Sequence, residues 1–135
     1  MSVRILLVDD STEFLESAAR FLSVDPQIEI VGRALSGPDA LDQIGRLHPD
    51  LVLMDLAMPG TNGLEATRCI KAQPGAPCVI ILTLYDDPEY RAEAGAVCAD
   101  GFVAKSAFGI ELLPLIHALF AKPPWAMTAE MHQDT

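Results

Sequence analysis

Leu51-Val52-Leu53-Met54-Asp55 joins four apolar residues to a carboxylate, and the turn residues Pro59-Gly60 follow a few positions later. Short apolar runs of this kind are typical of strands that are buried on both faces of a parallel sheet. Four more such runs occur along the chain, at residues 3–8, 28–31, 78–82 and 102–104. The sequence therefore predicts five strands.

Amphipathic stretches separate these runs, and their apolar residues recur at the spacing of a helix. We expect helices that begin after Ser11 or Thr12, at Gly37, at Gly63 and after Asp87, and a last helix over residues 110–120. Pro114 is expected in the first turn of the last helix or at a kink in it. Alternating strands and helices predict an α/β fold, a five-stranded parallel sheet with helices on both faces.

The composition narrows the class of protein. A chain of 135 residues suits one domain, and 50% hydrophobic residues argue against disorder. The net charge of −10 disfavours direct contact with nucleic acid, whose phosphates require Lys and Arg. Three cysteines without a C-x-x-C pair favour reduced thiols in the core. No secretory signal or membrane-spanning run is recognisable, so we expect a cytoplasmic protein.

Polar side chains stand where the strands end: Asp9 and Asp10, Asp55, Thr83, and Lys105. Each alone is more often a helix cap or a solvated side chain than a functional group. Because the carboxyl ends of parallel strands share one edge of the sheet, these five should meet in one crevice. Three converging carboxylates need a counter-charge, and Mg²⁺ with its preference for oxygen ligands would supply it.

Four segments carry a family resemblance: ILLVDD at residues 5–10, DLVLMDLAMPGTNGLEATR at 50–68, VIILT at 79–83 and DGFVAK at 100–105. Over residues 3–121 the chain resembles the receiver domain of bacterial two-component response regulators. It is most similar to regulators with a LuxR-type helix-turn-helix output. The resemblance implies a flavodoxin-like sheet with strand order 2-1-3-4-5.

The resemblance also implies roles in phosphorelay signalling. Asp55 would accept a phosphoryl group from the phosphohistidine of a sensor histidine kinase. Asp10 would bind Mg²⁺ directly and Asp9 through water, and the backbone carbonyl of Ala57 would be a further ligand. The chain would then be a signalling switch that catalyses its own phosphorylation rather than an enzyme with a separate substrate.

Thr83 and Lys105 would bind phosphoryl oxygens, and the switch would pass from Thr83 to Phe102, which rotates into the space that Thr83 leaves. Two departures from the family pattern bear on this site. Ser106 stands where many receivers have Pro, and Leu84 is larger than the small residue common at its position.

Two other functions stay open at this point. A phosphohydrolase with Asp55 as nucleophile would need a second acid two residues later, where the chain has Ala57. A pseudo-receiver that binds partners without phosphorylation is disfavoured because Asp10, Asp55, Thr83 and Lys105 are all present.

The expected organisation is a receiver domain over residues 1–121 and a tail or linker stub over 122–135. Output would be transcriptional control through a DNA-binding domain absent from this chain, or docking by a stand-alone regulator. The resemblance implies that phosphorylation alters a surface of the fourth helix, fifth strand and fifth helix, or a dimer made by the first and fifth helices. We expect at least a weak tendency to form a homodimer.

Overall fold

The computed structural model describes residues 2–121, and the predicted tail at 122–135 lies outside the described residues. Five strands form one parallel sheet in the order β2-β1-β3-β6-β7. Counted along the chain, these are the five expected strands, so the predicted order 2-1-3-4-5 is confirmed. Their bounds are β1 Val3–Val8, β2 Ile28–Ala34, β3 Leu51–Asp55, β6 Cys78–Thr83 and β7 Gly101–Ala104.

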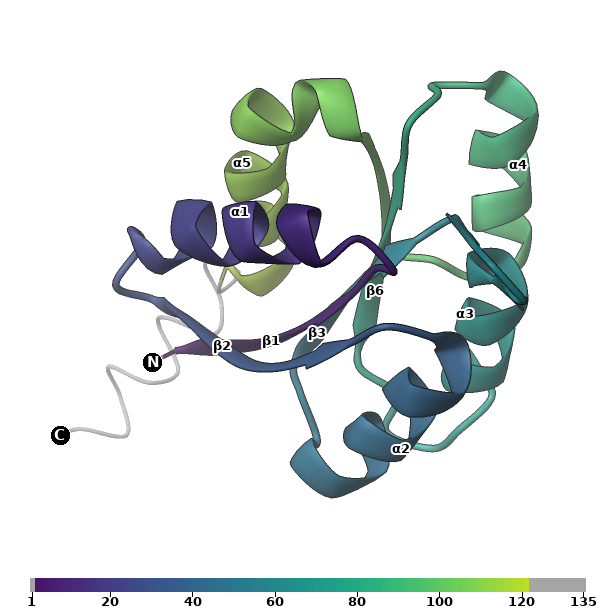
Figure 1. Ribbon diagram of the computed structural model, residues 1–135, viewed down its shortest axis with the longest axis horizontal. Helices are drawn as coiled ribbons and strands as arrows, with labels where there is room; N and C mark the ends of the chain where they lie inside the picture. Colours follow the sequence, from purple (N-terminus) through teal and green to yellow (C-terminus); the bar gives the residue numbers. More distant parts are fainter. Residues whose placement is uncertain (1, 122–135) are drawn as a thin grey trace, which may run out of the picture.

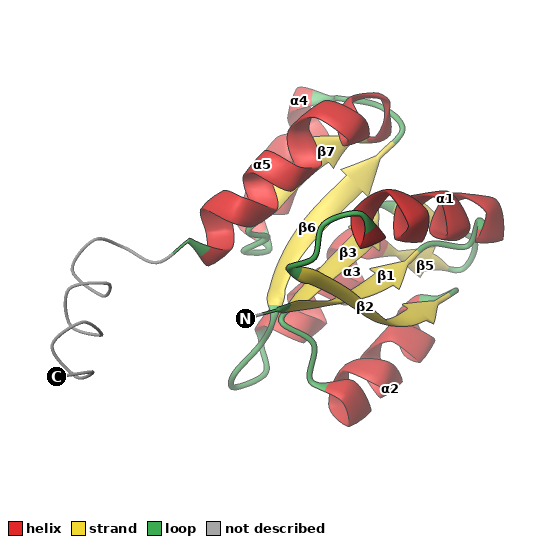
Figure 2. Ribbon diagram, turned by 90° about the vertical axis from the view of Figure 1, so that its left-hand side faces the viewer, coloured by secondary structure: helices red, strands yellow, loops and turns green. Residues whose placement is uncertain are grey.

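Helices cover both faces of the sheet (Figure 1). One layer holds α1 (Thr12–Ser23) and α5 (Phe108–Phe120), and the other holds α2 (Gly37–Leu47), α3 (Gly63–Lys71) and α4 (Pro88–Ala96). Successive residues of a strand point to opposite faces. Leu53 therefore packs in the α1/α5 layer, whereas Val52 and Met54 pack in the other. Figure 2 shows the same two layers from the side.

Polar caps fix where the helices begin. Ser11 Oγ accepts a hydrogen bond from Phe14 N at the start of α1, and Ser36 caps α2 in the same way. Asp87 caps α4 and Pro88 is its first residue, as the sequence predicts. These caps place each helix directly after the loop that leaves the carboxyl end of a strand.

Four features differ from the sequence-based expectations. Strand β2 is three residues longer than predicted, and a small antiparallel hairpin, β4 (Ala57–Met58) and β5 (Thr61–Asn62), follows β3. Pro114 lies in the middle of α5, not in its first turn. Cys69 and Cys98 are exposed and Cys78 is half-buried, so the prediction of core thiols is wrong. No helix in the described part of the chain combines the length and apolarity needed to cross a bilayer.

Candidate functional site at the carboxyl edge of the sheet

The residues predicted from the strand ends gather around one cavity of about 450 Å³. Asp9, Asp10, Asp55, Thr83 and Lys105 all line it, as does the hairpin residue Ala57. Asp9 and Lys105, which are 96 positions apart in the sequence, are thus brought into contact, because β1, β3, β6 and β7 end at the same edge of the sheet. A second cavity of about 510 Å³, at the amino ends of β1 and β2, contains none of these residues.

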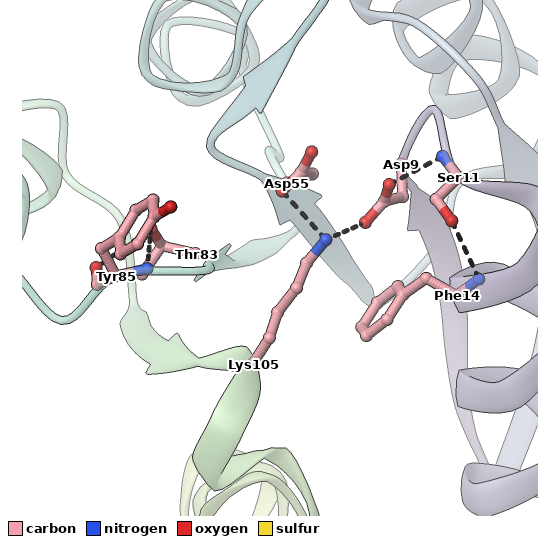
Figure 3. Close-up of polar contacts among 7 residues, drawn as sticks. All are labelled: Asp9, Ser11, Phe14, Asp55, Thr83, Tyr85 and Lys105. Atoms are coloured by element: carbon pink, nitrogen blue, oxygen red, sulfur yellow. Dashed lines mark hydrogen bonds and ion pairs between the residues drawn. The ribbon is translucent and has the colours of Figure 1, made fainter.

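The Lys105 ammonium lies between two buried carboxylates (Figure 3). Its Nζ donates to Asp9 Oδ2 at 2.6 Å and lies 3.3 Å from Asp55 Oδ1. The side chains are 2% exposed for Asp9, 7% for Asp55 and 14% for Lys105. Charges this well buried need a partner, and each carboxylate finds one in the same ammonium.

Three carboxylates converge here, since one oxygen each of Asp9, Asp10 and Asp55 lies within 4.8 Å of the others. Burial, followed by the charge of Asp9, raises the pKa of Asp55 to about 6, although Lys105 acts in the opposite direction. One ammonium against three acids leaves the cluster net negative. The arrangement can therefore take up a further cation.

The loop after Asp55 is held by backbone contacts. Leu56 N donates to Leu82 O at 2.8 Å, and Gly63 N donates to Leu56 O at 2.8 Å. Between them, Gly60 has a φ of +70°, as expected for the third residue of a type II turn that contains Pro59. The hairpin holds Ala57 at the rim of the cavity, next to Asp55.

Thr83 lines the cavity, but its hydroxyl is bonded to the neighbouring loop. Thr83 Oγ1 donates to Tyr85 O at 3.1 Å and accepts from Tyr85 N at 3.2 Å (Figure 3). Phe102 does not line the cavity. Its side chain is 8% exposed and packs in the α2/α3/α4 layer, and the Arg91 guanidinium lies 4.6 Å from the centre of its ring.

The cavity also contains residues that the sequence did not reveal as part of the site. Phe14, in the first turn of α1, lines it, and so do Ser11 and Tyr90. The N-cap position of Ser11 was the available signal, because it places α1 directly after the acidic pair. The exposed side chains of Leu84 and Tyr85 lie at the mouth of the cavity.

The response regulator receiver domain family model matches residues 5–120. The chain belongs to this family. Among curated proteins, the receiver is 36% identical over 119 residues to the transcriptional regulatory protein LiaR of Bacillus subtilis, covering 86% of this chain and 55% of LiaR. It is 42% identical over 102 residues to a protein-glutamate methylesterase/protein-glutamine glutaminase of Geobacter metallireducens, covering 72% of this chain and 29% of that protein.

A solved structure of a LuxR-family two-component response regulator from Aurantimonas sp. is also similar to the receiver. Its TM-score is 0.85 at 32% identity, with 98% of this chain and 99% of that chain covered. The chain spans about half, or less, of the length of the curated relatives named above. The receiver domain therefore acts in two-component phosphorelay signalling and is shared by regulators and by methylesterases.

Proposed function

We propose that Asp55 is the phosphoacceptor of this receiver and takes a phosphoryl group from the phosphohistidine of a sensor histidine kinase. One observation carries the proposal: a buried acid, Asp55, faces an ammonium and two more acids in an open cavity. A carboxylate oxygen of Asp55 forms the new P–O bond while the P–N bond to the imidazole breaks. The imidazole keeps the electron pair of that bond and takes up a proton.

Lys105 has the position required to neutralise the incoming group, because its Nζ already lies 3.3 Å from Asp55. Phosphoryl transfer depends mostly on positioning and on neutralising charge, and a fixed ammonium provides both. Thr83 is proposed to bind a phosphoryl oxygen through its hydroxyl. To do so it must turn away from Tyr85, to which it is bonded here.

The acidic cluster fits Mg²⁺, since its donors are all carboxylate oxygens and lie within 4.8 Å of one another. Asp9 is engaged by Lys105 and by Ser11 N, which supports direct ligation by Asp10 and Asp55 and a water-mediated role for Asp9. The carbonyl of Ala57 is the proposed backbone ligand. Bound Mg²⁺ supplies positive charge that neutralises the phosphoryl oxygens.

Phosphorylation of Asp55 is proposed to switch the surface through Thr83 and Phe102. The buried ring of Phe102 lies against Arg91 of α4, so movement of the ring alters contacts of that helix. Phe102 has no hydroxyl, and its state is therefore communicated through packing alone.

The test is phosphoprotein gel electrophoresis after incubation with acetyl phosphate and Mg²⁺. We expect a shifted band that Asp55→Asn abolishes and that Asp42→Asn, which changes an exposed carboxylate on α2, leaves intact. Absence of the band in the wild type would favour a pseudo-receiver. Continuous phosphate release that Asp55→Asn abolishes, through an aspartyl phosphate too short-lived to give a band, would favour a phosphohydrolase.

The biological output is proposed from the relatives. Two curated relatives are transcriptional regulatory proteins of which the matched segments cover only 44% and 55%, and a similar solved structure is that of a LuxR-family regulator. These relatives support a receiver over residues 1–121 linked through 122–135 to a LuxR-type DNA-binding domain. A stand-alone regulator that docks on a partner protein is the alternative. In either case we propose a cytoplasmic protein that forms a homodimer when phosphorylated.

A further inference from the structure

The Lys105 ammonium touches an aromatic ring as well as two carboxylates. Its Nζ lies 4.2 Å from the centre of the Phe14 ring, a distance at which the face of a ring attracts a cation. Phe14 and Asp9 belong to the segment over which β1 passes into α1: Asp9 lies in the connection, and Phe14 is in the first turn of α1. The ammonium is therefore held between an anion and a ring that the chain places five residues apart.

The backbone of that segment is closed on itself by hydrogen bonds. Ser11 N donates to Asp9 Oδ1 at 2.9 Å, and Ser11 Oγ accepts from Phe14 N at 3.2 Å. Together with the contacts of Lys105 to Asp9 and to Phe14, these bonds form a closed circuit of four residues (Figure 3). The position of the ring is thus tied to the position of the acid.

A second ring supports Phe14 from the side of Lys105. Phe108 meets Phe14 edge-on, with ring centres 5.5 Å apart and planes at 78°. Phe108 follows Lys105 by three residues, across the 3₁₀ turn Lys105–Ala107, and residues three apart in such a turn lie above one another. Phe21, about two turns further along α1, packs on Phe108 with centres 5.3 Å apart.

The geometry points to Phe14 as a positioning residue that holds the Lys105 ammonium beside Asp55. Without the ring, the flexible lysine side chain keeps its attraction to the acids but loses the packing contact that limits its movement toward α1. The expected consequence of this contact, faster phosphorylation of Asp55, rests on the proposed function. The contact between Phe14 and Lys105 itself does not.

The contact is tested in solution by NMR of the full chain labelled in its lysines, of which there are only three. Protons above the face of a ring resonate upfield, so the ε-methylene protons of Lys105 should be shifted upfield in the wild type. Lys105→Arg assigns the signal. Phe14→Leu should abolish the shift, Phe14→Tyr should retain it, and Phe21→Leu is the matched control that leaves it in place.

The consequence is tested by the rate of phosphorylation with acetyl phosphate at saturating Mg²⁺. We expect Phe14→Leu to slow it about 3- to 10-fold, the range of one cation–π contact at a partly exposed site, and Phe14→Tyr to restore it. An unshifted Lys105 signal in the wild type, or equal slowing by Phe14→Leu and Phe21→Leu, would overturn the proposal. Should no variant be phosphorylated, the proposed function fails while the NMR result still decides the role of Phe14.

Discussion

Lys105 Nζ lies 3.3 Å from Asp55 Oδ1, although the two residues are 50 positions apart in the sequence and at the ends of strands that are not neighbours in the sheet. β6 separates β3 from β7, so the lysine reaches across the end of that strand to meet the acid. This reach places one positive charge among three acids and sets the electrostatics of the site.

Replacing Lys105 by Met should destabilise the metal-free protein in a pH-dependent way. At pH 8 the loss should be about 2–4 kcal/mol, because the buried carboxylates then lack a partner. At pH 5 the loss should be smaller, since the pKa of Asp55 is about 6 and this acid is mostly neutral there. Urea unfolding at the two pH values, in the presence of a chelator, measures both. An equal loss at pH 5 and pH 8 would contradict this account.

Asp55→Asn should stabilise the metal-free protein at pH 8 by about 1–2 kcal/mol. The folded-state pKa of Asp55 is raised from 3.8 to about 6, so ionisation costs stability as pH rises between these values, and Asn removes that cost. We expect a gain in stability smaller than the full free energy that corresponds to the pKa shift, because solvent at the mouth of the cavity screens part of the interaction. At pH 3 the gain should nearly vanish, because the acid is then mostly protonated in both states. Unfolding curves from pH 3 to pH 8 give the profile, and destabilisation at pH 8 would refute it.

Mg²⁺ should raise the melting temperature through the acidic cluster. At ten times its dissociation constant, a ligand that binds only the folded state adds about 1.4 kcal/mol, or about 5 °C for a domain of this size. Asp10→Asn should remove most of that shift. Asp42→Asn should keep it, because this exposed carboxylate pairs with Arg46 on α2, far from the cluster. A similar rise in melting temperature in both variants would show that Mg²⁺ binds outside the acidic cluster.

Gly63→Ala should displace the loop that carries Asp55. A Cβ at Gly63 would lie 2.1 Å from the backbone oxygen of Asp55, so the loop that carries the acid must move. We expect a loss of about 2–4 kcal/mol and slower phosphorylation. Gly95→Ala is the control: a Cβ there meets nothing within 4 Å, and its helical position predicts no loss or a small gain. Thermal unfolding of the two variants side by side tests the difference.

Dimerisation should depend on the phosphorylated state. We expect beryllofluoride with Mg²⁺, which mimics the acyl phosphate, to increase the weight-average mass in sedimentation velocity over a wide range of protein concentrations. Asp55→Asn should show no such increase. An unchanged mass in the wild type across that range would count against the proposed homodimer.

The sheet and the polar cluster could be predicted from sequence because both follow from strand ends. Apolar runs that stop at Asp9, Asp55, Thr83 and Lys105 mark the edge where parallel strands must deliver these side chains. The short hairpin after Asp55 escaped prediction, since strands of two residues carry no periodicity. Its strands pair with each other, and the bond from Gly63 N to Leu56 O closes its base.

Other features depend on contacts that are distant in the sequence. Phe14 fits the apolar face of α1, and only the approach of Lys105 from β7 gives its ring a polar neighbour. Pro114 was expected in the first turn of the last helix or at a kink in it, because it cannot donate to the carbonyl of Ile110. That residue is 80% exposed, so water can satisfy its carbonyl and α5 runs through the proline.

The two hydrogen bonds between Thr83 and Tyr85 impose a cost on any signal that starts at Asp55. If the threonine hydroxyl turns toward an acyl phosphate, the amide of Tyr85 loses its partner and must find another, and the carbonyl of Tyr85 keeps only the bond from Asp87 N. The backbone of the β6–α4 connection would then rearrange together with the side chain. Leu84 and Tyr85, each more than two-thirds solvent-accessible, would move with it. Phosphorylation of the buried Asp55 would then change the conformation of residues on the surface directly.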